Sequence, residues 1–145
     1  MVEISILGEA NERGLNDIRE LLQQLHEGKP SHLEPNIEQL EELVSDKTAA
    51  MIVAKDGEKI VGMAVMFIFA RVGEASGYVD DVIVDNAYRG QGIATQLMEK
   101  LISVARENKL RHLDLTSRPS REAANHLYQK LGFEKRDTNP YRLKL

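Results

Sequence analysis

The stretch VDNAYRGQGIATQLM (84–98) decides the fold, because two glycines and an arginine stand at the start of a strong helical pattern. Glycine is about 1 kcal/mol less favourable than alanine inside a helix, so Gly90 and Gly92 need a reason to be there. A strand is expected before this corner and a helix after it, from about 91 to 108. Unpaired N–H groups and the positive end of a helix then face the same way, and Arg89 adds a cation. The corner is therefore a candidate anion site.

Three phosphate-binding patterns compete for this loop. A dinucleotide-binding loop needs a third glycine where the chain has Thr95, and a Walker loop needs a Gly-Lys-Ser/Thr ending that the sequence lacks. The pattern (Q/R)-x-x-G-x-(G/A) is satisfied by Arg89, Gly92 and Ala94. A tight turn with close packing of helix against strand explains the glycines equally well, so the spacing alone leaves both interpretations open.

The remaining chain alternates between helical and strand patterns. Apolar residues at helical spacing predict helices over 15–25, 36–44 and 121–132, with Asn36 as the N-cap of the second. β-branched and apolar runs predict strands over 2–7, 49–54, 60–70, 77–85, 112–117 and 141–145, with Asp56-Gly57 as a hairpin turn. With 145 residues and neither repeats nor linkers, the pattern predicts a single domain (1–145) of the α/β or α+β class with a mixed sheet.

Composition narrows the classes of function. A formal net charge of -4 argues against a nucleic-acid binder. The chain has no cysteine, which excludes disulfides and a cysteine nucleophile and is compatible with the cytoplasm, where we expect the protein. No signal peptide is recognised, and the longest apolar run is too short to cross a membrane. No metal is expected, because the histidines show no ligand spacing; they are His26, His32, His112 and His126.

Two motifs together resemble one family. VIVDNAYRGQGIATQLM (82–98) is similar to the acetyl-CoA pyrophosphate loop of the GNAT superfamily of N-acetyltransferases, and AANHLYQKLGFEKR (123–136) resembles their C-terminal helix-turn-strand signature. The resemblance implies a mixed, mostly antiparallel central sheet flanked by helices, with parallel strands that splay apart at the cofactor site. It further implies acetyl-CoA as cosubstrate and direct acetyl transfer, in a ternary complex, to a primary amine of a small molecule, peptide or protein. A homodimer is a family-level expectation.

The resemblance also assigns cofactor contacts. The pantetheine arm is expected to pair with the backbone of Val82, Ile83 and Val84, in the gap facing 112–117. The pyrophosphate is expected on a run of loop amides, led by Arg89 and made of Gly90, Gln91, Gly92, Ile93, Ala94 and Thr95. Many relatives carry a cofactor-contacting asparagine where this chain has Arg121, and Asn125 is a weaker substitute.

Three side chains are candidates for proton transfer. Tyr128 matches the family tyrosine that protonates the departing thiolate, although its place in an apolar helical stripe also fits a core residue. An alkylammonium of pKa about 10.4 needs a proton acceptor before it can attack. Asp80 and Asp81 lie in a strand expected to be buried, where alternation sends them to opposite faces. Similarity to glucosamine-phosphate N-acetyltransferases makes Asp80 the expected base, acting through water, and Asp81 its support; structural salt bridges are the alternative.

Two questions stay open at this level. Arg118 and Arg121 could hold a substrate phosphate or carboxylate, or the 3′-phosphate of coenzyme A, or could belong to a solvated loop. The chain could also be a binding module that keeps the coenzyme A loop without turnover and acts as a sensor or partner subunit.

Overall fold

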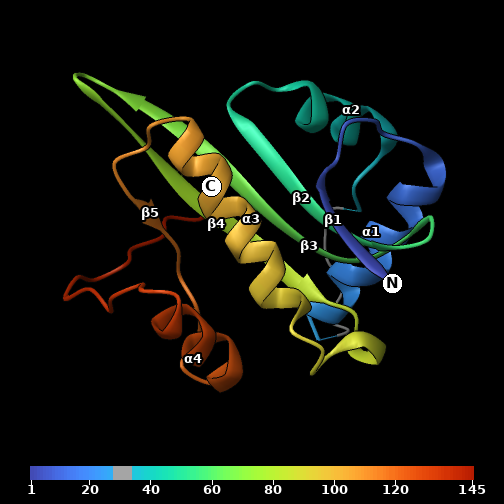
Figure 1. Cartoon of the computed structure of the whole chain (residues 1–145). Helices are drawn as coiled ribbons and strands as arrows, with labels where there is room; N and C mark the ends of the chain where they lie inside the picture. The colour runs from blue at the N-terminus through green and yellow to red at the C-terminus, as the bar shows by residue number, and fades with distance from the viewer. Residues whose placement is uncertain (28–33) are drawn as a thin grey trace. The chain divides into compact units, whose positions relative to one another are not determined.

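The computed structural model describes residues 1–27 and 34–145, so His32 lies outside the described residues (Figure 1). The chain divides into two compact units, Met1–Leu115 and Thr116–Leu145. The first unit holds the sheet and three α-helices, and the second holds one helix and the C-terminal tail.

The sheet of the first unit has five strands in the order β1-β2-β3-β4-β5. Neighbours are antiparallel, except that β4 and β5 run parallel. The expected mixed, mostly antiparallel sheet is therefore confirmed. The strands are β1 (Val2–Ile6), β2 (Ala49–Asp56), β3 (Lys59–Arg71), β4 (Glu74–Val84) and β5 (Leu113–Asp114).

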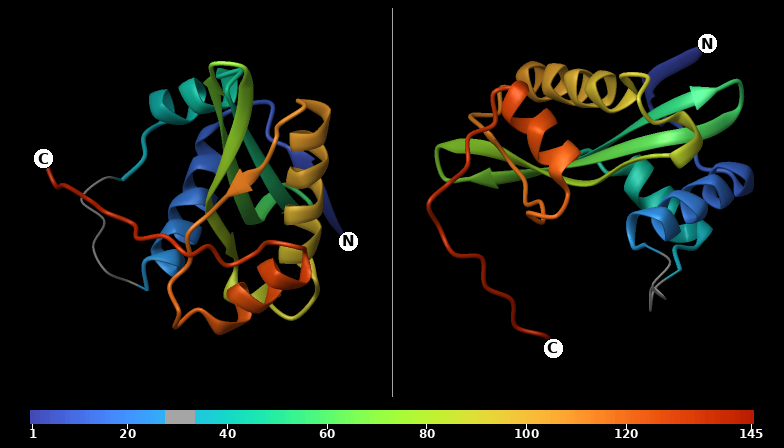
Figure 2. Two further views of the ribbon diagram at one scale, coloured as in Figure 1. Left: turned by 90° about the vertical axis from the view of Figure 1, so that its left-hand side faces the viewer. Right: turned by 90° about the horizontal axis from the view of Figure 1, so that it is seen from below.

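Helices cover both faces of this sheet. Helix α3 (Ile93–Glu107) lies on one face, and α1 (Glu12–Leu25) and α2 (Ile37–Ser45) lie on the other (Figure 2). The expected N-cap of α2 is confirmed, because the Asn36 side chain accepts from the Gln39 N–H at 2.9 Å and a full capping box forms. Apolar residues at helical spacing give each helix one face to bury against the strands.

The apolar core is centred on β2 and β3. Successive side chains of these strands point to opposite faces of the sheet, and so towards the two helical layers in turn. On the side of the sheet that α1 and α2 cover, buried side chains of the helices and strands form one cluster, which includes Leu15, Leu21, Met51 and Met63. On the α3 side, Leu97 and Leu101 are fully buried among others. Burying side chains of this size on both faces supplies the main driving force for folding. The same packing holds α3 against the sheet that contains β4.

The second unit departs from the expected pattern. Its helix α4 (Glu122–Lys130) forms as predicted, and Gly132 follows with φ 100°. The strand predicted over 141–145 is wrong, as is the strand implied after Gly132, because none of residues 133–145 belongs to a strand. Tyr141, Leu143 and Leu145 are exposed. Alternation describes how a segment could pair, whereas a strand forms only where a neighbouring strand accepts its hydrogen bonds.

Candidate active site

The parallel pairing of β4 with β5 ends about halfway along β4. The parallel ladder joins only two residue pairs, Gly77 with Leu113 and Tyr78 with Asp114. Strand β4 continues to Val84, still paired with β3 on its other edge. The strand predicted over 112–117 is thus largely wrong, because β5 is only two residues long. In the described residues, the β5-facing edge of β4 beyond Tyr78 carries no ladder, and the predicted pantetheine-binding residues Val82, Ile83 and Val84 lie on this part of the strand.

A β-bulge interrupts β4 at the acidic pair. Val65 pairs with Asp80 and Met63 pairs with Ile83, so β4 carries one residue more than β3 between these positions. Asp81 occupies the left-handed region with φ 51°, and its N–H donates to the Asp80 carboxylate at 2.9 Å. The strict alternation expected for the two aspartates is therefore wrong, because the extra residue breaks the pleat between them.

The two carboxylates differ in environment. Asp80 is exposed, whereas Asp81 is half-buried. Burial raises the pKa of Asp81, the negative charge of Asp80 raises that pKa further, and His26 at the end of α1 opposes both effects. Neither aspartate forms a salt bridge with Arg71 within the described residues. A carboxyl group of raised pKa on an open strand edge is the kind of group that proton transfer requires.

The glycine loop follows directly from β4. A single 3₁₀ turn, η1 (Asn86–Tyr88), leads into Arg89, and Gly90 and Gly92 adopt φ of 78° and 77°. A Cβ added at either glycine would meet nothing within 4 Å. The glycines are therefore needed for their left-handed backbone, and the space in front of them is open.

Helix α3 begins without a capping side chain. Gly92 is its N-cap and supplies none, and the first intrahelical bond runs from the Gln96 N–H to the Gly92 carbonyl at 3.1 Å. The amide groups of the first turn, which include Ile93, Ala94 and Thr95, lie ahead of that bond and have no intrahelical acceptor. Arg89 is exposed beside them, with Nε donating to the Val84 carbonyl at 3.3 Å. These groups together are suited to bind an anion.

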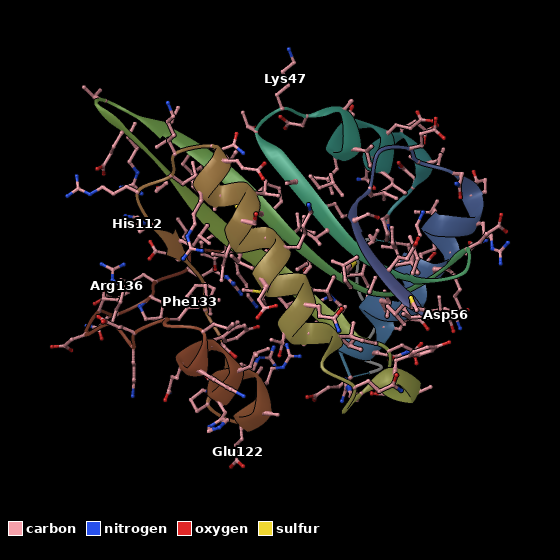
Figure 3. All side chains as sticks on the ribbon, viewed as in Figure 1. Lys47, Asp56, His112, Glu122, Phe133 and Arg136 are labelled. Atoms are coloured by element: carbon pink, nitrogen blue, oxygen red, sulfur yellow. The ribbon has the colours of Figure 1, made fainter. Side chains whose placement is uncertain are left out.

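Two residues whose contacts sequence reasoning missed, Gln24 and Asp56, hold the start of the loop. The Gln24 side chain of α1 bonds to both Asp85 and Asn86. Asp56, labelled in Figure 3, ends β2, and the sequence marks it only as a turn residue. Its carboxylate accepts a hydrogen bond from the Tyr88 hydroxyl at 2.7 Å. The bond to Asp56 raises the pKa of Tyr88. No sequence signal marks Gln24, because polar residues on an amphipathic helix look alike until their distant partners are known.

The second unit holds the other predicted residues. Tyr128 is buried, and its ring meets that of Phe133 edge-on, with the ring centroids 5.9 Å apart. Phe133 is labelled in Figure 3. Burial raises the pKa of Tyr128, and the charge of Arg121 opposes this rise. Asn125 Nδ2 donates to the carbonyl oxygens of Arg118 and Arg121 at 2.8 Å each, so this side chain braces the loop before α4. The cofactor contact of Asn125 and the catalytic role of Tyr128 stay predictions.

Two features of the described residues bear on the type of site. Across residues 1–27 and 34–145, no group of three or more His, Asp or Glu side chains could hold a metal ion. In the same part of the chain, no helix is long and apolar enough to cross a membrane.

Comparison with known proteins decides the family. The profile of the Acetyltransferase (GNAT) family matches residues 15–133, which include the glycine loop and most of the C-terminal motif. The chain belongs to the GNAT family. As a GNAT protein it shares its fold with a transcriptional regulator from Bacillus halodurans C-125, at a TM-score of 0.82 and 28% identity, with 100% of each chain covered.

Two curated relatives of this GNAT protein are named for small amines. The L-2,4-diaminobutyric acid acetyltransferase of Halalkalibacterium halodurans is 34% identical over 83 residues, which are 57% of this chain and 43% of that protein. The glucosamine 6-phosphate N-acetyltransferase of Trypanosoma brucei brucei is 37% identical over 78 residues, or 52% of this chain and 51% of that protein. The matched region thus covers about half the length of these relatives.

The backbone at Gly92 gives a first prediction. Gly92→Ala should lower the free energy of unfolding by about 1 kcal/mol, because alanine disfavours the left-handed region. Gly8→Ala is the matched control, since a Cβ there also meets nothing within 4 Å but Gly8 lacks a positive φ. Denaturant unfolding of both variants measures the effect. An equal change at both positions would contradict the account.

The raised pKa of Asp81 gives a second prediction, in the pH dependence of stability. A carboxyl group whose pKa is higher in the folded state favours folding when protonated, so its contribution is complete below about pH 4 and is lost as pH rises through the folded pKa. Asp81→Asn should therefore raise Tm above the native value at pH 8, and the difference should vanish near pH 4. Thermal unfolding across this range tests it, with Asp80→Asn, at the exposed neighbour, expected to give a smaller gain. A difference independent of pH would overturn the assignment.

Proposed function

We propose that this protein transfers the acetyl group of acetyl-CoA to a primary amine by direct attack within a ternary complex. The observation that carries the proposal is the glycine loop between an unpaired strand edge and an uncapped helix. Gly90 and Gly92 turn the chain so that the first-turn amides of α3 stand open at the end of β4. An anion-binding helix end beside free strand backbone matches the chemistry of a diphosphate joined to an amide-containing arm.

The two parts of coenzyme A bind to two parts of this site in the proposed complex. The pyrophosphate accepts hydrogen bonds from the amides of 90–95, with Arg89 adding positive charge at the rim. The pantetheine amides pair with backbone groups of Val82–Val84 on the edge of β4 that carries no ladder with β5, next to the Val84 carbonyl that accepts from Arg89 Nε. Both contacts use backbone groups, so the fold itself supplies most of the recognition.

The reaction needs one proton acceptor and one proton donor. The neutral amine nitrogen attacks the thioester carbonyl, a C–N bond forms, and the C–S bond breaks as the tetrahedral intermediate collapses. The amine proton passes to a carboxylate, and the coenzyme A thiolate takes a proton from a donor. We assign the acceptor to the Asp80–Asp81 pair and the donor to Tyr128.

Within the acidic pair, the environment favours Asp81 as the acceptor. A general base works best when its pKa lies near the working pH, and burial together with the Asp80 charge moves the pKa of Asp81 in that direction. Asp80, which the family resemblance favours, is exposed and holds the Asp81 amide. In this scheme Asp80 fixes the bulge, and a water molecule can link either carboxylate to the amine.

The acceptor is proposed to be a small molecule with a primary amine. The two curated relatives are named for diaminobutyric acid and glucosamine 6-phosphate, and each compound carries such an amine. An assay of thiol release from acetyl-CoA, with these two compounds and a peptide with a free N-terminus, tests the class. Turnover with a small amine supports the proposal, and turnover with the peptide alone would contradict this choice of acceptor.

Tyr128 provides the third prediction. Tyr128→Phe removes the proton donor and should lower kcat about a hundredfold, a typical effect for general acid catalysis. The affinity for acetyl-CoA should change little, because the ring is kept. Tyr141→Phe is the matched control, since Tyr141 is exposed in the same unit. Steady-state kinetics and calorimetry separate the two quantities, and an unchanged kcat for Tyr128→Phe would remove this residue from the mechanism.

A binding module without turnover is the second candidate. The structural relative described as a transcriptional regulator shares the fold at 28% identity, which gives this alternative some support. Tight binding of acetyl-CoA with no turnover across a broad amine panel would favour the module over the enzyme.

A further inference from the structure

The C-terminal turn of α1 reaches the glycine loop through one side chain. Gln24 is half-buried in the last turn of α1 (Glu12–Leu25), 61 residues before the loop begins at Asp85. Its Nε2 donates to Asp85 Oδ2 at 3.3 Å, and its Oε1 accepts from the Asn86 N–H at 2.9 Å. Both ends of one carboxamide are therefore used on two successive loop residues.

These two bonds act where the chain leaves the sheet. The Asp85 N–H still donates to the Val61 carbonyl of β3 at 2.8 Å, as in a ladder. One residue later, the Asn86 N–H has left the sheet and Gln24 is its acceptor. Asp85 Oδ1 accepts from the Ala87 N–H at 2.8 Å, so the same carboxylate caps η1 and binds Gln24. The direction of η1 is thus fixed jointly by β3 and α1.

The orientation of η1 sets the orientation of the loop amides. The turn is closed by the Tyr88 N–H, which donates to the Asp85 carbonyl at 2.9 Å, and only Arg89 separates it from Gly90. A rotation of this short, closed turn would therefore also rotate the loop amides that follow it, from Gly90 onward. Loop amides bind an anion well only when they are held in place before it arrives.

We infer that Gln24 is a positioning residue, which ties the C-terminal turn of α1 to the glycine loop and holds the loop amides in their anion-binding arrangement. The inference rests on the proposed use of the loop for acetyl-CoA. His26, two residues further along, acts electrostatically on Asp81 of the bulge. One helix end therefore influences both the cofactor loop and the proposed base.

Alanine substitution measures the contribution of Gln24. Gln24→Ala should raise the Kd and the KM for acetyl-CoA about five- to tenfold, which corresponds to one or two ordinary hydrogen bonds. The kcat should stay within about twofold, because the proposed proton-transfer groups are unchanged. Gln23→Ala is the matched control: it is the same substitution on an exposed neighbour in the same helix, and it should bind acetyl-CoA as the native protein does.

An exchange of donor and acceptor gives the sharper test. Gln24→Glu places the new carboxylate against the carboxylate of Asp85. Asp85→Asn, with its amide oxygen still accepting from the Ala87 N–H, places its NH2 group against the NH2 group of Gln24. Each single variant should therefore bind acetyl-CoA more weakly. In the double variant, the new amide at position 85 can donate to the new carboxylate at position 24, which can still accept from the Asn86 N–H. The double variant should therefore recover affinity to within about twofold of native. A residue that only stabilised the fold would change Tm without this pattern in Kd.

The outcomes separate the inference from the proposed function. If the native protein binds acetyl-CoA and Gln24→Ala binds equally well, the inference fails while the proposed function stands. A folded double variant that does not recover affinity would also overturn it. If the native protein does not bind acetyl-CoA, the proposed function and the inference fail together. Should alanine at position 24 prevent folding, the exchange pair, which keeps side-chain size, decides alone.

Discussion

The architecture depends on the point at which β4 loses its second neighbour. Through Tyr78, β4 is paired on both edges, and beyond it, within the residues that the structure describes, only the β3 ladder continues. Backbone N–H and C=O groups need partners, so an open edge next to a covered sheet face is a surface on which an extended, amide-bearing molecule can bind. The glycine loop and the uncapped start of α3 begin where this edge ends. The β4 edge beyond the short β5 ladder and the glycine loop that follows β4 thus provide both halves of the proposed cofactor site.

Three residues with left-handed backbone lie in the same short region. Asp81, Gly90 and Gly92 all adopt positive φ, within twelve residues of one another. Such conformations persist where surrounding contacts fix them. Here the Asp80 carboxylate holds the Asp81 amide, while Gln24 and Asp56 hold η1 from two sides. The proposed base and the proposed anion site are therefore prearranged by contacts from the sheet and from α1, and substitutions at these supporting residues are expected to alter function through geometry.

Much of this arrangement could be predicted from sequence, and what could not has identifiable physical reasons. Local rules sufficed for the helices, for the Asn36 cap and for the glycine corner, because spacing, capping and φ requirements depend on neighbouring residues. The length of β5 and the fate of 141–145 depend on which strand lies alongside, which alternation does not encode. The bulge at Asp81 depends on register with β3, so the predicted alternation was wrong there. Gln24 was missed for the same reason, since its partners are 61 and 62 residues away.

The most direct test of the central claim is calorimetric titration of acetyl-CoA into the native protein and into Gly92→Glu, with NAD as the control ligand. The account predicts micromolar binding of acetyl-CoA alone, which Gly92→Glu abolishes because a carboxylate then occupies the space in front of the α3 amides. Absence of acetyl-CoA binding by the native protein, or equal binding by the folded variant, would contradict the assignment of the glycine loop as the cofactor site.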